Sequence, residues 1–178
     1  TNASGRSGGI GYLIDASRGH GERLATIYED ERVSYTAQHK AVARLAAQLV
    51  ALGVGRGTRV AIAMRNLPEW PVAFFAATAI GAVMVPLNAW WTGAEMAYGL
   101  ADSGARVLIT DDERHHRLED IYATIPSLEQ LLVSRAVAPL TGIAAPLEDV
   151  IGASSHWATL PDQPLPDAVI APDDDATI

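Results

Sequence analysis

The stretch RVAIAMRNLPEWPVAFFAATAIGAVMVPLN, Arg59 to Asn88, decides the fold of this chain. It opens with a compact apolar run of strand length, 59–64, and closes with a second such run, 83–87. Between the two runs, Asn66 and Pro68 predict the N-cap and first position of a helix. A strand, a helix and a strand in this order predict a βαβ unit, whose two strands run parallel.

The same alternation of short apolar runs and helical patterns continues on both sides of this unit. A helix is predicted from Ala37, where apolar residues recur at helical spacing, with Thr36 as its N-cap and Gly53 just after its end. The remaining expected elements are a short helix at 10–17, a hairpin of 25–28 and 33–35, helices at 93–102 and 116–124, and strands at 106–110 and 131–133. The predicted fold class is therefore α/β, Rossmann-like, with a largely parallel sheet flanked by helices.

The two ends of the chain differ in composition from these alternating strand and helix segments. Residues 1–8 read as a flexible leader, and residues 136–172 hold six prolines among small and polar residues. This Pro-rich segment predicts a long surface connection with one short helix at 147–151. The last residues, 176–178, alternate like the first residues of a buried strand, so we expect one subdomain over residues 1–178 that ends as a strand begins.

Composition excludes several classes of function. The formal net charge is −8, and the 13 Lys and Arg are scattered, so no basic stripe is available for nucleic acid. There is no cysteine, which excludes disulfides, thiol nucleophiles and thiolate metal sites. The longest apolar stretch, 70–87, is interrupted by proline and glycine, so no membrane span is predicted, and a cytoplasmic setting is expected.

Short motifs give no catalytic site and no metal site. The glycines of 5–11 and 53–57 lack the strand context of a phosphate loop, so a leader and a helix end are the favoured readings. His115 and His116 are adjacent, which places their side chains about 100° apart on a helix, and a solvated helix start is expected there. The run Asp173–Asp175 lacks the spacing of a calcium loop and predicts a solvated turn.

Six segments, taken in order, resemble the N-terminal region of adenylate-forming enzymes, the family of acyl-CoA synthetases, luciferases and peptide-synthetase adenylation domains. They are Val33-Ser34-Tyr35, Arg44-Leu45-Ala46, Gly57 to Ile62, Asn66 to Glu69, Gly81 to Asn88 and Leu100 to Ala105. Where the family commonly has Glu-Leu after the first segment, this chain has Ala37-Gln38. The resemblance runs from about Ile10 to Ile178 and favours an acyl-CoA synthetase over a peptide synthetase.

The resemblance implies a two-step reaction. A fatty or other apolar carboxylic acid attacks ATP, with Mg²⁺, to give an acyl-adenylate, and coenzyme A then takes the acyl group. The family's phosphate loop follows the segment that matches Asp174 to Ile178, so this chain by itself is expected to bind none of these cofactors and to form no acyl-adenylate. We expect no catalytic residue within it.

The resemblance also implies peripheral contacts with coenzyme A. Asn88, Ala89 and Trp90 follow the Gly81–Asn88 segment and are the candidates for its adenine end. Arg114 and Arg117 are the candidates for its 3′-phosphate, because a guanidinium suits that group. The alternative is structural: a capped turn, an aromatic packed on the next helix, and two solvated arginines.

Two functions of other classes remain open from the sequence. A complete flavodoxin-like module would bind a nucleotide or flavin at the carboxyl ends of its strands. A non-enzymatic interaction domain would expose an apolar face and form a homodimer or bind a partner.

Overall fold

A five-stranded parallel sheet forms the centre of the molecule. The computed structural model describes residues 10–178, so the predicted leader at 1–8 lies outside the described residues. The strands lie in the order β4-β3-β5-β6-β7. Their bounds are β3 Arg59–Ala63, β4 Val83–Pro86, β5 Val107–Asp111, β6 Gln130–Ser134 and β7 Ala144–Pro146. The predicted α/β class with a parallel sheet is confirmed.

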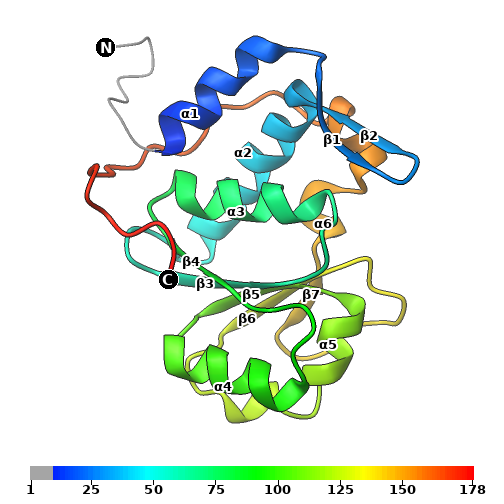
Figure 1. Ribbon diagram of the computed structural model, residues 1–178, viewed down its shortest axis with the longest axis vertical. Helices are drawn as coiled ribbons and strands as arrows, with labels where there is room; N and C mark the ends of the chain where they lie inside the picture. The colour runs from blue at the N-terminus through cyan, green and yellow to red at the C-terminus, as the bar shows by residue number, and fades with distance from the viewer. Residues whose placement is uncertain (1–9) are drawn as a thin grey trace.

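Helices cover both faces of this sheet (Figure 1). On one side lie α1 Ile10–Ser17, α2 Tyr35–Ala51, α3 Glu69–Ala79 and α6 Glu148–Ile151, and on the other lie α4 Gly93–Ser103 and α5 Asp112–Leu118. The hairpin of β1 Leu24–Tyr28 and β2 Glu31–Ser34 stands apart from the sheet beside α2. Short 3₁₀ turns occupy Arg18–His20, Tyr122–Thr124 and Ser154–Thr159.

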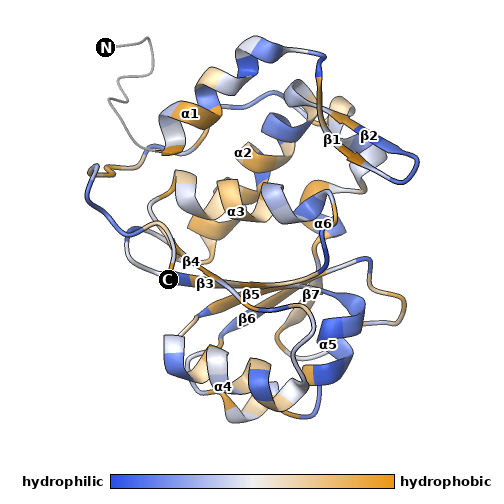
Figure 2. Ribbon diagram, in the orientation of Figure 1, coloured by the Kyte–Doolittle hydropathy of each residue, from blue (hydrophilic) through white to orange (hydrophobic). Residues whose placement is uncertain are grey.

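Alternation along the strands builds two cores. In β3, Val60 and Ile62 face the helix layer of α2 and α3, whereas Ala61 and Ala63 face the layer of α4 and α5. All four side chains are fully buried. Because both faces are covered, the strands are apolar through their middle residues, as Figure 2 shows for the centre of the sheet.

Three helix starts differ from their predictions. The hydroxyl of Ser34, and not that of Thr36, caps α2, accepting from the backbone N–H of Ala37 at 3.2 Å. Pro68 takes the N-cap position of α3 in place of Asn66. Helix α5 starts at Asp112 instead of 116, because the Asp111 side chain caps it by accepting from the backbone N–H of Arg114.

The Pro-rich segment is partly interior, so its predicted surface character is wrong over part of its length. It supplies β7, which adds an edge strand beside β6, and α6 falls close to the predicted short helix. Beyond α6, the ring of Trp157 is fully buried, and its Nε1 donates to the carbonyl of Gly152 at 3.1 Å. Leu165 is buried as well.

The last residues, where the alternation predicted the start of a strand, lie beside β4 and form an isolated bridge with it. Thr177 forms a parallel bridge with Met84. The Met84 N–H donates to the carbonyl of Ala176 at 2.9 Å, and the Ile178 N–H donates to the carbonyl of Met84 at 3.0 Å. Within residues 10–178, none of the helices has the length and apolar character needed to cross a membrane.

Candidate functional site

The carboxyl ends of the parallel strands form the candidate site. Chain order reverses at β3, since β4 lies on one side of it and β5 on the other. In open α/β sheets, ligands bind in the crevice at such a switch point. Here Arg65 follows β3, Asp111 ends β5 and Arg135 follows β6, so all three lie at this edge of the sheet.

The structure brings the predicted site residues together. After β4, residues 88–91 form a turn in which the Asn88 side chain accepts from the backbone N–H of Trp90 at 2.9 Å. Arg114 donates from Nε to the carbonyl oxygen of Ala89 at 2.8 Å. Arg117 donates to the same oxygen at 3.3 Å and to the carbonyl of Trp91 at 2.9 Å. The two arginines of α5 therefore hold the 88–91 turn by its main chain.

Arg114 is buried, so its expected solvated alternative is wrong. Its side chain is 1% exposed, and its Nη1 lies 3.1 Å from Asp111 Oδ2 and 2.9 Å from Glu113 Oε2. Asp111 also accepts from the backbone N–H of Arg65 at 3.0 Å. The charge of Arg114 lowers the pKa of Glu113, and the hydrogen bond and charge of Arg117 add to that effect. Arg114 is thus committed to carboxylates and to the turn.

Trp90 is the prominent exposed group of this turn. Its side chain is 69% exposed, and the guanidinium of Arg65 lies over its ring, 4.3 Å from the centroid. This cation–π contact fixes one face of the indole. An aromatic ring supported in this way offers a stacking surface for a planar ligand.

Two cavities open along the same edge. One, of about 430 Å³, lies at the switch point between the ends of β3 and β5 and is lined by Tyr28, Arg65, Asn66, Leu67, Asp111, Asp112, Glu113, Arg114 and Arg135. The other, of about 570 Å³, lies at the ends of β6 and β7 and is lined by Glu31, Glu69, Arg135, Ala136, Ala138, Pro146, Glu148, Ala153, Ser154 and Ser155. Arg135 lines both.

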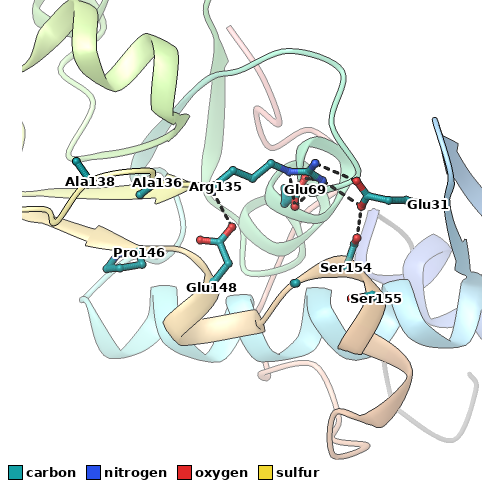
Figure 3. A pocket seen from close by; sticks show the side chains of 10 residues that line it. Glu31, Glu69, Arg135, Ala136, Ala138, Pro146, Glu148, Ser154 and Ser155 are labelled. Carbon is teal, nitrogen blue, oxygen red and sulfur yellow. Dashed lines mark hydrogen bonds and ion pairs between the residues drawn. The ribbon is translucent and has the colours of Figure 1, made fainter.

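Arg135 connects four parts of the chain in the second cavity (Figure 3). Its guanidinium lies between Glu31 of β2, with Nη1 2.9 Å from Oε1, and Glu69 of α3, with Nη2 3.1 Å from Oε1. Its backbone N–H donates to Glu148 at 2.7 Å, and its guanidinium stacks over the ring of Tyr28 at 5.6 Å. The residue adopts a left-handed backbone, φ 57°, a conformation uncommon outside glycine.

The two carboxylates held by Arg135 differ in acidity. Burial raises the pKa of Glu69, and the hydrogen bonds and charge of Arg135 only partly offset it. Burial also acts to raise the pKa of Glu31, but hydrogen bonds from Arg135 and Ser154 outweigh it and leave that pKa lowered. The network therefore contains one carboxylate with a raised pKa, Glu69, and one with a lowered pKa, Glu31.

The other sequence candidates lie elsewhere. His116 is exposed, but His115 is buried and stacks on Tyr122, so the solvated helix start predicted for the pair is wrong for His115. Gly53 ends α2 with φ 77°, as predicted for a helix end. Asp174 pairs with Arg56. Among residues 10–178, no cluster of three or more histidine or acidic side chains has the arrangement of a metal site.

Several residues of this edge were not singled out from the sequence. Arg65, Asp111 and Arg135 each end or follow a buried strand, and a charged residue at that position was the available signal. Glu31 and Glu69 carried no such signal, because they reach Arg135 only through the tertiary fold.

The charge balance limits what these cavities can bind. The first cavity offers three arginines and three carboxylates, and the second offers one arginine and three carboxylates. Carboxylates therefore equal or outnumber the arginines in each cavity, which disfavours a polyphosphate there, although Nη2 of Arg114 has no hydrogen-bond partner among the described residues. The exposed Trp90 supported by Arg65 is instead suited to stacking an aromatic ring.

Comparison with known proteins shows the family of the chain. The sequence model of a family described as AMP-binding enzyme matches residues 13–178. A crotonobetaine/carnitine–CoA ligase of Citrobacter koseri is 31% identical over 154 residues, which cover 84% of this chain and 28% of that protein. A 4-hydroxybenzoate–CoA/benzoate–CoA ligase of Rhodopseudomonas palustris is 31% identical over 131 residues, 73% of this chain and 24% of that protein. The chain spans about a quarter of the length of these relatives.

Solved structures share the fold. Coronafacic acid ligase from Pectobacterium brasiliense superposes with a TM-score of 0.83 at 20% identity, covering 96% of this chain and 33% of that one. The N-terminal domain of FACL13 from Mycobacterium tuberculosis superposes with a TM-score of 0.74 at 25% identity, covering 97% of this chain and 41% of that one.

Proposed function

Because the chain belongs to the AMP-binding enzyme family, we propose that it is the N-terminal part of a longer carboxylate–CoA ligase. The proposed ligase activates a fatty or other apolar carboxylic acid with ATP and Mg²⁺ and transfers the acyl group from the adenylate to coenzyme A. The family match over residues 13–178 carries this proposal. CoA ligases among the relatives favour this activity within the family.

Within that ligase, the proposed role of this chain is to position the coenzyme A entrance. The exposed ring of Trp90, backed by Arg65, suits the adenine of coenzyme A, with Asn88 and Ala89 shaping the turn below it. Arg117 keeps a side chain that is 29% exposed and is accessible to the 3′-phosphate. Arg114 is buried, so it acts as a positioning residue that holds the turn.

ATP and Mg²⁺ find no comparable fit among the described residues. The arginines that line the two cavities face an equal or larger number of carboxylates there. We therefore assign no step through ATP or Mg²⁺ to residues 10–178 and propose that the isolated chain forms no acyl-adenylate.

A panel assay tests the ligase activity. In a protein that carries this chain together with the remainder of the ligase, we expect ATP-dependent thioester formation with coenzyme A from medium-chain fatty acids or aromatic acids, measured by mass spectrometry. Adenylate formation without transfer to coenzyme A would favour a peptide-synthetase adenylation domain, a class that also occurs among the relatives. Hydroxamate formation from acid, ATP and hydroxylamine by the isolated chain would contradict its proposed inactivity.

A second titration tests the coenzyme A contact. In the longer protein, Trp90→Ala should raise the KM for coenzyme A by roughly tenfold, since stacking on an aromatic contributes about 1–3 kcal/mol per base. The control is Tyr98→Ala, which removes another exposed aromatic side chain, from α4. Arg117→Met should reduce the preference for coenzyme A over dephospho-coenzyme A. Equal effects of the two aromatic substitutions would exclude Trp90 from the site.

The rival functions predict different results. A flavodoxin-like module would bind a nucleotide or flavin tightly as the isolated chain, which calorimetry measures. An interaction domain would self-associate through exposed apolar side chains such as Leu13, Ile27 and Tyr98, which light scattering detects. We expect no tight binding of a nucleotide or flavin to the isolated chain. We also expect the ligase activity of the longer protein to persist when Leu13, Ile27 and Tyr98 are replaced.

A further inference from the structure

An apolar cavity of about 380 Å³ lies between α1, α2 and α3, away from the carboxyl edge of the sheet. Ile14 of α1, Val42 of α2 and Phe75 of α3 contribute apolar walls, and Leu13 also lines the cavity. None of the residues that line it lines the two cavities of the candidate site. Its volume falls in the range of small-molecule sites, roughly 300–1,000 Å³.

His39 gives this cavity a single buried polar feature. Its side chain is 2% exposed, and its Nε2 lies 3.3 Å from Asp15 Oδ1. A carboxylate only accepts hydrogen bonds, so Nε2 carries the proton and Nδ1 keeps its lone pair. Among the described residues, Nδ1 has no hydrogen-bond partner. A buried acceptor without a partner is unfavourable, and a ligand that donates to it removes that cost.

The charged groups around His39 favour its neutral form. Burial lowers the pKa of His39 and outweighs the raising effect of the hydrogen bond with Asp15. Arg18 lowers that pKa further, and Asp162 raises it. A neutral ring with a lone pair on Nδ1, beside the carboxylate of Asp15, disfavours an anion in the cavity.

Two of the neighbouring polar side chains, Ser17 and Gln38, have hydrogen-bond partners of their own. Ser17 donates from Oγ to the carbonyl of Ile14 at 2.6 Å. Gln38 accepts at Oε1 from the hydroxyl of Thr26 at 3.0 Å. Neither contact involves Nδ1 of His39, which is enclosed and has no hydrogen-bond partner among the described residues.

We propose that this cavity is a second ligand site, for a small neutral molecule with an apolar body and one hydroxyl group that donates to His39 Nδ1. Alcohols and phenols fit this description, whereas the carboxylic acids proposed as substrates of the ligase do not. The site is therefore distinct in ligand class from the proposed function, and the two can fail independently.

Three matched probes test the proposal on the 178-residue chain by calorimetry. 1-Naphthol has the apolar body and the donor, naphthalene lacks the donor, and 1-naphthoate carries a charge. We expect saturable 1:1 binding of 1-naphthol, binding of naphthalene weaker by roughly tenfold, the factor of one hydrogen bond, and the weakest binding for 1-naphthoate. Equal affinity for naphthol and naphthalene, or tighter binding of naphthoate, would overturn the proposed ligand class.

Substitutions locate the binding. His39→Leu removes both ring nitrogens, the Nδ1 acceptor included, so it should lower the affinity for 1-naphthol to that for naphthalene. Leu13→Glu places a charge in a residue that lines the cavity and should weaken both neutral probes. Val50→Glu changes another exposed apolar residue, near the end of α2, and should change neither. Both glutamate variants alter exposed side chains, so they keep the test decisive if His39→Leu unfolds. Equal affinities in the two glutamate variants would show that the probes bind elsewhere.

Discussion

Arg114 donates from Nε to the carbonyl oxygen of Ala89, 2.8 Å away, and so joins α5 to the turn that follows β4. The same guanidinium pairs with Asp111, which caps α5 and accepts from the backbone of Arg65. One buried side chain therefore links the ends of β3, β4 and β5, where the proposed coenzyme A contact lies.

Removal of the Arg114 side chain should lower the free energy of unfolding substantially. Arg114→Met leaves the buried carboxylate of Asp111 without its counter-ion, a change that typically lowers the free energy of unfolding by about 3–5 kcal/mol. Arg117→Met is the control, because Arg117 donates to the same turn but pairs with Glu113, which is 60% exposed. Arg117→Met should lower the free energy of unfolding by about 1 kcal/mol or less. Urea unfolding measures both, and equal losses would contradict the assigned role of Arg114.

The start of α4 depends on the absence of a side chain at Gly93. A Cβ there would lie 2.1 Å from the carbonyl oxygen of Arg117, so α4 could not keep its distance from α5. We expect Gly93→Ala to lower the free energy of unfolding by about 2 kcal/mol or more. Gly55→Ala, at a position with no atom within 4 Å of the added Cβ, should change it by less than about 0.5 kcal/mol. Similar losses in both variants would show that α4 can shift.

The predictable part of the fold followed from periodicity. The apolar runs that became β3, β4, β5 and β6 each have both faces buried, so they read as strands without knowledge of their neighbours. The three-residue strand β7, Ala-Ala-Pro, has no such run and is recruited only by pairing with β6. Its existence is a tertiary effect that local sequence does not encode.

The candidate site was predictable to a smaller extent. The resemblance to the family, and not helical spacing, singled out Arg114 and Arg117, and both do contact the turn at 88–91. Their partners are main-chain carbonyls, which no side-chain pattern reveals. The link from Arg135 to Glu31 spans 104 residues and depends on the hairpin folding over the end of β6.

Two buried histidines should make stability fall at mildly acidic pH. Burial is the main factor that lowers the pKa of both His39 and His115 below the ordinary value of 6.5. Between the folded pKa and 6.5 the unfolded chain binds more protons, so the free energy of unfolding decreases as pH falls from about 6.5 through the folded pKa.

Urea unfolding from about pH 7.5 to about pH 5, roughly one unit above and one and a half units below the ordinary histidine value, checks this pH dependence. His39→Gln and His115→Gln should each flatten the profile, because each removes one titrating group. His156→Gln, which replaces an exposed histidine, is the control for the substitution itself. A wild-type profile that rises on acidification would show that these rings gain a counter-ion in the folded state.

A double variant should distinguish the cost of leaving Glu69 charged and unpaired from the cost of losing the contacts of Arg135. The Glu69 side chain is 3% exposed, and burial raises its pKa, so it depends on Arg135 to remain charged. Arg135→Met should lower the free energy of unfolding at pH 7 by about 2–4 kcal/mol, because it leaves a buried carboxylate unpaired. Adding Glu69→Gln to that variant should recover about half of the loss or more, since an amide costs less to bury than a charge.

Acid provides an independent check on the same pair. With Arg135 removed, the pKa of Glu69 in the folded state rises further, so the folded state takes up a proton more readily than the unfolded chain. The decrease in unfolding free energy caused by Arg135→Met should therefore become smaller as pH falls toward about 5. Arg106→Met breaks an exposed pair with Glu129 and should change the free energy of unfolding much less, because solvent screens surface ion pairs. Two results together would contradict the role of Glu69: a double variant Arg135→Met/Glu69→Gln no more stable than Arg135→Met, and a difference in unfolding free energy between wild type and Arg135→Met that acid does not reduce. Arg135 would then stabilise the edge of the sheet through Glu31 and through its packing on Tyr28.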